Sequence, residues 1–154
     1  MDRKEQIKNI MNLDYKIKRL NVFSLLGLAP PFEMGILTCL KNSEDSRVCV
    51  SGIARSLNAT SPNVSRVLKS LEKEGKVYRE VDENDRRNTF VYLTDKGKEC
   101  LKQTGRTVGE FMFGVLDCLG DEELLGYSEI MKKLYSSYVS ETEKIKKAKS
   151  KAND

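Results

Sequence analysis

Residues 60–97 read TSPNVSRVLKSLEKEGKVYREVDENDRRNTFVYLTDKG, and this stretch decides the fold. Residues 61–74 have apolar side chains at helical spacing, a proline in the first turn and Gly75 just after the end. Residues 77–81 and 89–93 alternate like β-strands, and the segment between them is polar and rich in turn-forming residues. The stretch therefore predicts an amphipathic helix followed by a β-hairpin with a long charged tip.

Immediately upstream, the pattern predicts a second short helix at residues 51–57, with Ser51 as its N-cap. A turn at 58–60 joins it to the helix at 61–74, which Thr60 or Ser61 caps. Two short helices joined by so short a turn have the geometry of a helix-turn-helix. A further helix is expected at residues 32–40, and a very short extended piece at 48–50.

The two ends of the chain predict longer helices. Apolar residues at helical spacing predict one basic helix over residues 3–26, which Gly27 and two prolines then break. A helix from Lys96 toward residue 119 and another over 121–147 are expected after the hairpin. The basic tail at 148–154 is expected to fray.

The amino-acid composition excludes some classes of function but does not identify one. Lys and Arg exceed Asp and Glu by 27 to 23, and this net charge of +4 permits a nucleic-acid partner without requiring one. The chain has no His, which removes the usual general base and the commonest zinc ligand. Its four Cys form no CxxC pair. We expect no enzyme activity, no cofactor and no metal.

The expected cellular location is the cytoplasm. The scattered cysteines suit a reducing compartment, and the first ten residues, MDRKEQIKNI, are charged rather than apolar. No apolar run approaches the roughly 20 residues that span a bilayer, so no membrane segment is predicted.

The helix at 61–74 predicts a surface that reads DNA. Short polar side chains near its start let the backbone approach base edges, and the positive end of the helix dipole favours phosphate. Arg side chains suit guanine edges or phosphates, and Asn suits adenine. The candidate residues on this helix are Ser61, Asn63, Ser65, Arg66 and Lys69. The alternative is an ordinary solvated amphipathic helix.

The hairpin tip adds a second candidate surface. Arg86 and Arg87 lie there, and an Arg inserted into a narrow minor groove is stabilised by the groove's negative potential. Asp85 can hold one guanidinium in a fixed orientation by a charge-assisted hydrogen bond. The alternative is a surface turn with a weak ion pair.

Together these residues resemble the winged-helix core of the MarR family of transcriptional regulators. The resemblance rests on a Ser- and Val-rich helix and three motifs in order, and residues 119–134 also resemble the family's last helix. The motifs are Leu71-Glu72-Lys73-Glu74-Gly75, Asp85-Arg86-Arg87 and Leu93-Thr94-Asp95-Lys96-Gly97.

This resemblance implies a mainly α fold with a small β-hairpin, forming one MarR-like domain over residues 1–154. Residues 32–98 would be its winged-helix core, and residues 1–31 and 99–147 would form dimerisation helices. It implies a homodimer that binds a palindromic operator on double-stranded DNA, more often as a repressor, and that a small aromatic or lipophilic effector can release.

The resemblance also implies individual roles for the candidate residues. Arg87 would enter the minor groove, Asp85 would orient it, and Arg86 would touch phosphate. The residues of the helix at 61–74 would face the major groove or its rims.

Two alternatives remain open. The chain could be a winged-helix module that binds proteins instead of DNA. It could also be a regulator that senses oxidants through Cys39 and Cys49, which flank one loop, although a buried Cys more often behaves as a small apolar side chain.

Overall fold

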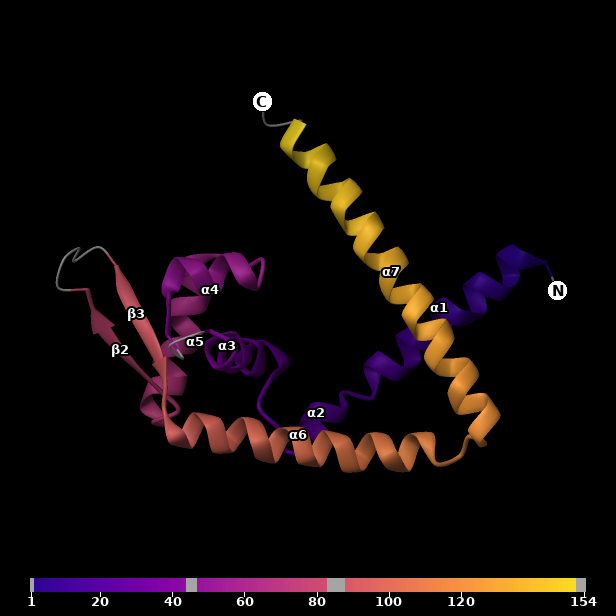
Figure 1. The fold of residues 1–154 in the computed structure, drawn as a ribbon, viewed down its shortest axis with the longest axis horizontal. Coiled ribbons are helices and arrows are strands. Elements are labelled where there is room, and N and C mark those ends of the chain that lie inside the picture. The colour runs from indigo at the N-terminus through magenta and orange to yellow at the C-terminus, as the bar shows by residue number, and fades with distance from the viewer. Residues whose placement is uncertain (1, 44–46, 83–87, 152–154) are drawn as a thin grey trace. The chain divides into compact units, whose positions relative to one another are not determined.

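The structure is a computed structural model that describes residues 2–43, 47–82 and 88–151, with side-chain surroundings described up to residue 148. It is mainly α-helical with one small antiparallel sheet, which confirms the predicted fold class (Figure 1). The elements in chain order are α1 (Arg3–Arg19), α2 (Val22–Leu25), α3 (Pro31–Lys41), β1 (Arg47–Cys49), α4 (Val50–Ser56), α5 (Ser61–Lys73), β2 (Val77–Val81), β3 (Thr89–Leu93), α6 (Asp95–Leu116) and α7 (Asp121–Lys151).

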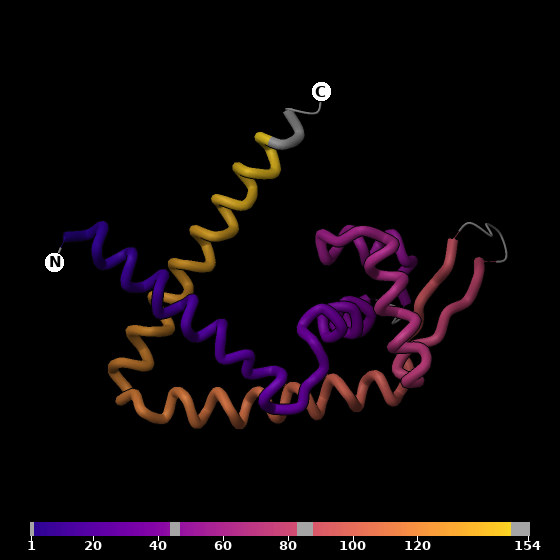
Figure 2. The backbone as a smooth tube through the Cα atoms, turned by 180° about the vertical axis from the view of Figure 1, so that it is seen from behind, coloured from indigo at the N-terminus to yellow at the C-terminus, as the bar shows by residue number. Residues whose placement is uncertain are grey.

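One hydrophobic core holds α3, α4, α5 and the sheet together. Both views place these helices beside the hairpin of β2 and β3 (Figure 1, Figure 2). The apolar positions predicted for the helix at 61–74 supply three fully buried side chains, so periodicity identified the inward face of α5 correctly. The fully buried side chains of the core are Ile36, Leu37, Leu40, Ile53, Val64, Leu68, Leu71 and Val91, and Val77 is nearly so.

The sheet has three strands, in the order β1-β3-β2, instead of the two expected for a hairpin. The short extended piece predicted at 48–50 is the third strand, which spans Arg47–Cys49 and pairs Val48 with Val91 of β3. One face of the sheet is buried. On the other face, the rings of Tyr78 and Tyr92 stack with their centroids 4.6 Å apart.

Two tight helix ends set the geometry of the helix-turn-helix. Asn58 follows α4 with φ of 49°, and Gly75 follows α5 with φ of 70°, the left-handed conformation that Asn tolerates and Gly favours. In each case the next amide closes the turn: Ala59 N–H donates to the Ala54 carbonyl at 2.9 Å, and Lys76 N–H to the Leu71 carbonyl at 2.9 Å. Gly75 was predicted at this position, whereas Asn58 was predicted only as part of the turn.

The predicted N-cap of the first of these helices is wrong. The helix α4 begins at Val50 with Cys49 as its N-cap, one residue earlier than expected, because Cys49 is still paired in β1 when the chain turns. Thr60 does occupy the N-cap position of α5, but its side chain forms no capping hydrogen bond.

The joint between the sheet and α6 explains the motif Leu93-Thr94-Asp95-Lys96-Gly97. Thr94 caps α6 by accepting a 3.1 Å hydrogen bond from the Gly97 amide, and its hydroxyl donates to the Gly75 carbonyl at 2.8 Å. A Cβ at Gly97 would lie 2.3 Å from the Lys76 carbonyl oxygen, so only glycine fits there. The joint therefore ties the end of α5, the start of β2 and the start of α6 together.

The long helix predicted at residues 3–26 is broken. Asn21 adopts φ of 47° and separates α1 from the four-residue α2, a break that continuous apolar periodicity did not reveal. At the other end, α7 extends to Lys151, four residues beyond the predicted end of the helix. None of the described helices is long and apolar enough to cross a membrane.

By compactness the chain divides into two units, Met1–Val108 and Gly109–Asp154. The first contains the helix-turn-helix and sheet, and the start of α6 packs on it through Thr104, whose hydroxyl lies 3.8 Å from the sulfur of Met34. The second contains the end of α6 and all of α7.

Candidate nucleic-acid interface

The polar face of α5 is presented to solvent because its opposite face is anchored in the core. Val64, Leu68 and Leu71 are fully buried. Arg66 and Lys69 are exposed on the other side, and they follow each other at the three-residue spacing that places side chains on one helical face. The structure thus fixes the helix backbone while leaving the long cationic side chains of Arg66 and Lys69 in solvent.

The other candidate residues of α5 flank this cationic line. Ser61 is exposed as the first residue of the helix, whereas Asn63 and Ser65 are half-buried. Arg66 Nη2 donates a 2.9 Å hydrogen bond to Asn63 Oδ1, which holds the guanidinium along the helix surface. Because this bond is exposed, a base edge or a phosphate can replace it at little cost.

A polar hollow of about 340 Å³ opens beside the start of α5. It gathers residues from three parts of the chain that are distant in sequence: the turn from β1 into α4, the first turns of α5, and the start of β3 with the residue before it. Hydroxyl groups and an amide dominate its lining, so it suits a hydrogen-bonding or anionic group more than an apolar one. The lining residues are Cys49, Val50, Ser51, Ser61, Ser65, Asn88 and Thr89.

Cys49, Ser51 and Asn88 were not among the DNA-contact candidates from the sequence. The Cys49 sulfur lies 3.3 Å from the Ser51 hydroxyl, and this hydrogen bond lowers the pKa of the Cys49 thiol despite its partial burial. The Cys-x-Ser spacing was visible in the sequence, but only the fold shows that it faces Ser61 and Ser65. Cys39 lies apart from this hollow and packs against the core from α3.

An ion pair fixes the hairpin to α5. Glu72 of α5 accepts hydrogen bonds from Nε of Arg79 on β2 at 3.0 Å and from its Nη2. The Arg79 guanidinium holds the pKa of the Glu72 carboxyl below its usual range. A second pair, Glu74 with Lys76 at 2.5 Å, spans the turn between the two elements and lowers the pKa of Glu74.

The predicted wing residues Asp85, Arg86 and Arg87 lie outside the described residues. The base of the wing is described: the strand ladder continues past Val81 and Thr89 to a 3.0 Å hydrogen bond from the Asp82 amide to the Asn88 carbonyl. The two strands therefore remain paired up to the segment that carries the charged residues.

The MarR family model matches residues 31–89, which contain the helix-turn-helix and most of the sheet. The uncharacterized HTH-type transcriptional regulator YdgJ of Bacillus subtilis (strain 168) is 33% identical over 88 residues, or 57% of this chain and 52% of that protein. The transcriptional repressor MprA of Escherichia coli (strain K12) is 31% identical over 77 residues, or 50% of this chain and 43% of that protein. The chain thus spans about half the length of the curated relatives it matches.

Solved structures resemble the chain over most of its length. The YusO protein from Bacillus subtilis superposes with a TM-score of 0.72 at 22% identity, covering 88% of this chain and 99% of that one. Sco3205, a MarR family transcriptional regulator from Streptomyces coelicolor crystallised in complex with DNA, superposes with a TM-score of 0.64 at 25% identity, covering 90% and 93%. The fold is therefore that of MarR-type winged-helix proteins.

Proposed function

We propose that the chain is a sequence-specific regulator of transcription of the MarR type that binds double-stranded DNA, because the MarR family model matches residues 31–89. MarR family members are transcriptional regulators, not enzymes. The observation that carries the proposal is the exposed polar and cationic face of α5, held rigidly above a buried apolar face and beside a polar hollow.

In the proposed complex, α5 lies in the major groove. Arg66 exchanges its hydrogen bond with Asn63 for a base edge or a phosphate, and Lys69 pairs with the backbone. Ser61 and Ser65 face a groove rim, where the hollow that they share with Ser51 receives a backbone phosphate.

The wing complements the helix in the neighbouring minor groove. We assign Arg87 to the groove, Asp85 to orienting it and Arg86 to phosphate, as the sequence motif implies. The Glu72–Arg79 pair supports this assignment because it fixes the base of the hairpin to α5, so that helix and wing engage one duplex together.

The proposal includes a homodimer on a palindromic operator. Every residue of α1 is at least partly exposed, including a series of large apolar side chains that a single chain in water would not leave uncovered. Those of α1 are Ile7, Ile10, Met11, Leu13, Tyr15 and Ile17, with exposures from 48% to 66%, and Leu20 just after the helix is 59% exposed. We propose that a second copy covers them and that the two α5 helices of this dimer read half-sites about one turn of DNA apart, as in other dimeric helix-turn-helix proteins.

We further propose that the chain acts as a repressor in the cytoplasm and that a small aromatic or lipophilic molecule releases it. The relative MprA is named a transcriptional repressor, which favours this direction of control. An effector that binds best to one spacing of the two α5 helices would change the affinity for DNA.

Fluorescence anisotropy with a duplex from the chain's own upstream DNA and with a scrambled duplex tests the proposal. Tight binding to the first alone, weakening steeply with salt, is expected. Arg66→Ala and Arg87→Ala should each weaken specific binding by about tenfold or more, since a good base contact contributes about 1–3 kcal/mol. Lys102→Ala, an exposed lysine on α6, is the matched control and should leave binding unchanged.

The alternative of a protein-interaction module makes the opposite prediction. In that case Arg66→Ala and Arg87→Ala would bind DNA no worse than Lys102→Ala does. Thermal melts of all three variants separate a loss of contacts from a loss of folding.

A further inference from the structure

The cations of α5 and of the segment that follows it fall into two groups. Arg66, Lys69 and Lys73 of α5 are exposed, and none of them forms an ion pair with another residue that the structure describes. Lys76 and Arg79 are half-buried, with side-chain exposures of 15% and 28%, and each is bonded to a carboxylate. The structure thus separates cations that can reach a phosphate from cations that are already neutralised.

The two carboxylates, Glu72 and Glu74, lie where the helix itself disfavours them. Glu72 is in the last turn of α5 and Glu74 is its C-cap, at the negative end of the helix dipole. Glu72 also follows Lys69 by three residues, which places it next to the exposed cations on the same face. A carboxylate there repels phosphate as well as the helix end, so its contact with β2 is what offsets these costs.

The geometry of the Glu72–Arg79 pair shows what this contact provides. A single oxygen, Glu72 Oε2, accepts hydrogen bonds from Arg79 Nε at 3.0 Å and from Arg79 Nη2. Two donors of the planar guanidinium are thereby used, and the group is held against α5 in one orientation. To reach a phosphate, Arg79 would have to give up both bonds and leave the Glu72 carboxylate unpaired.

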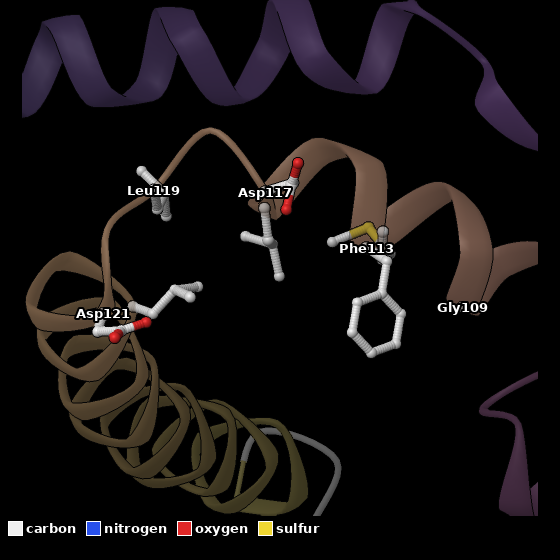
Figure 3. Close-up of a pocket in the computed structure, with 8 residues that line it drawn as sticks. Gly109, Phe113, Asp117, Leu119 and Asp121 are labelled. Carbon is white, nitrogen blue, oxygen red and sulfur yellow. The ribbon is translucent and has the colours of Figure 1, made fainter.

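Pairing between two elements is not general among the carboxylates of this chain. Asp117 and Asp121, on either side of the turn between α6 and α7, line a pocket that no basic side chain shares (Figure 3). Several other ion pairs join residues three or four apart on one helix. Glu72 and Arg79, by contrast, belong to two different elements, α5 and β2.

We infer that Glu72 withholds Arg79 from the DNA backbone and thereby raises the ratio of specific to non-specific DNA binding. Each cation that neutralises a phosphate adds affinity for any sequence, because condensed counterions are released. A guanidinium that is bonded to a carboxylate adds none of this affinity, but it holds the hairpin in a fixed place beside α5. Arg79 is thus a positioning residue. This inference rests on the proposed DNA binding.

The salt dependence of binding distinguishes a positioning cation from a phosphate-binding cation. The targets are a duplex that the parent chain enriches from a random pool and a scrambled duplex of the same length, followed by fluorescence anisotropy. For the scrambled duplex, Lys69→Gln should reduce the slope of log affinity against log salt by about 1 for each chain bound. The double variant Glu72→Gln, Arg79→Gln, which keeps the net charge, should leave that slope unchanged and weaken specific binding about fivefold. An equal loss of slope in both proteins would overturn the inference, because Arg79 would then be a phosphate contact.

The single variant Glu72→Gln releases Arg79. It should tighten binding to the scrambled duplex about threefold to tenfold and lower the ratio of specific to non-specific affinity about fivefold. Glu80→Gln is the matched control, because Glu80 is exposed on β2 and forms no ion pair with another described residue. It removes the same charge and should change the ratio less than about twofold. Equal ratios in these two variants would overturn the inference.

The parent chain separates failure of the inference from failure of the proposed function. If the parent enriches no sequence, the proposed function fails and the inference fails with it. If the parent discriminates between the duplexes but the variants give either contrary result, the inference alone fails. Circular dichroism melts define a temperature at which all the variants are folded, and binding is compared there.

Discussion

Replacing Gly97 with alanine tests how the wing is joined to the rest of the domain. The added Cβ would lie 2.3 Å from the Lys76 carbonyl oxygen and 2.6 Å from Leu93 Cδ1. That carbonyl cannot move away freely, because it also accepts a 3.2 Å hydrogen bond from the Thr94 amide. The substitution therefore forces either the base of the sheet or the start of α6 to shift.

The expected cost is about 1–3 kcal/mol, the usual range for forcing extra volume into a packed site. Alanine's better helix propensity offsets less than about 1 kcal/mol of this cost. For a chain of this length the midpoint of thermal unfolding should fall by about 2–4 °C for each kcal/mol. Urea unfolding followed by far-UV circular dichroism, at one fixed protein concentration, measures the change directly.

Gly105→Ala on the same helix is the matched control. Gly105 is exposed, and a Cβ there would meet nothing within 4 Å, so alanine should stabilise the chain by about 0.5–1 kcal/mol. The reasoning fails if Gly97→Ala is as stable as the parent protein, or if both substitutions shift stability in the same direction.

Three further predictions concern the ion pair, the hollow and the exposed helix. The hydrogen bonds from Arg79 lower the pKa of Glu72, so this pair stabilises the folded state above the ordinary glutamate pKa and loses that contribution as the pH falls through the lowered value. The free energy of unfolding of Glu72→Gln should therefore be about 0.5–1 kcal/mol lower than that of the parent near pH 7, and this difference should vanish in acid. A difference that stays constant from pH 7 to about pH 2 would contradict the assignment of the ion pair. Alkylation of Cys49 with N-ethylmaleimide should block the polar hollow and weaken DNA binding, whereas DNA binding by the Cys49→Ser variant should resist the reagent. If the reagent weakened DNA binding equally in the parent and in Cys49→Ser, the reactive thiol would lie elsewhere. Ile10→Asp should shift the protein from dimer to monomer in sedimentation analysis, whereas Asn12→Asp, which introduces the same charge on α1, should not. If Ile10→Asp remained a dimer, this face of α1 would be excluded from the interface.

The sequence predicted the winged-helix core well because several local signals agree there. Apolar periodicity, an early proline and Gly75 together define α5, and alternating residues define β2 and β3. Each of these signals acts within a few residues of the feature that it predicts, so tertiary context had little to override.

Outside α5, β2 and β3, the local sequence patterns were too weak to predict the structure or gave no indication of it. The break at Asn21 depends on one residue taking a left-handed conformation, while the apolar spacing continues on both sides. The strand β1 has only three residues, and its pairing with β3 joins residues more than 40 positions apart. That pairing also moves the N-cap of α4 from Ser51 to Cys49.

In the candidate site, too, features within one helix could be predicted from the sequence, whereas features that combine distant segments could not. Ser61, Asn63, Ser65, Arg66 and Lys69 were predicted as DNA contacts from one helix, and the structure places all five on the exposed or half-buried part of α5, while their contact with DNA stays a prediction. The polar hollow could not be predicted, because its residues come from β1, α4, α5 and β3 and meet only after folding.

Selection of bound sequences from a pool of random duplexes, with the full chain as the bait, tests the central claim most directly. The account predicts one enriched sequence with two-fold symmetry, whose half-sites lie about one helical turn apart. It also predicts that the enrichment disappears with an Arg66→Ala, Arg87→Ala double variant that still folds. Failure of the parent chain to enrich any sequence, or enrichment of the same sequence by the double variant, would contradict the account.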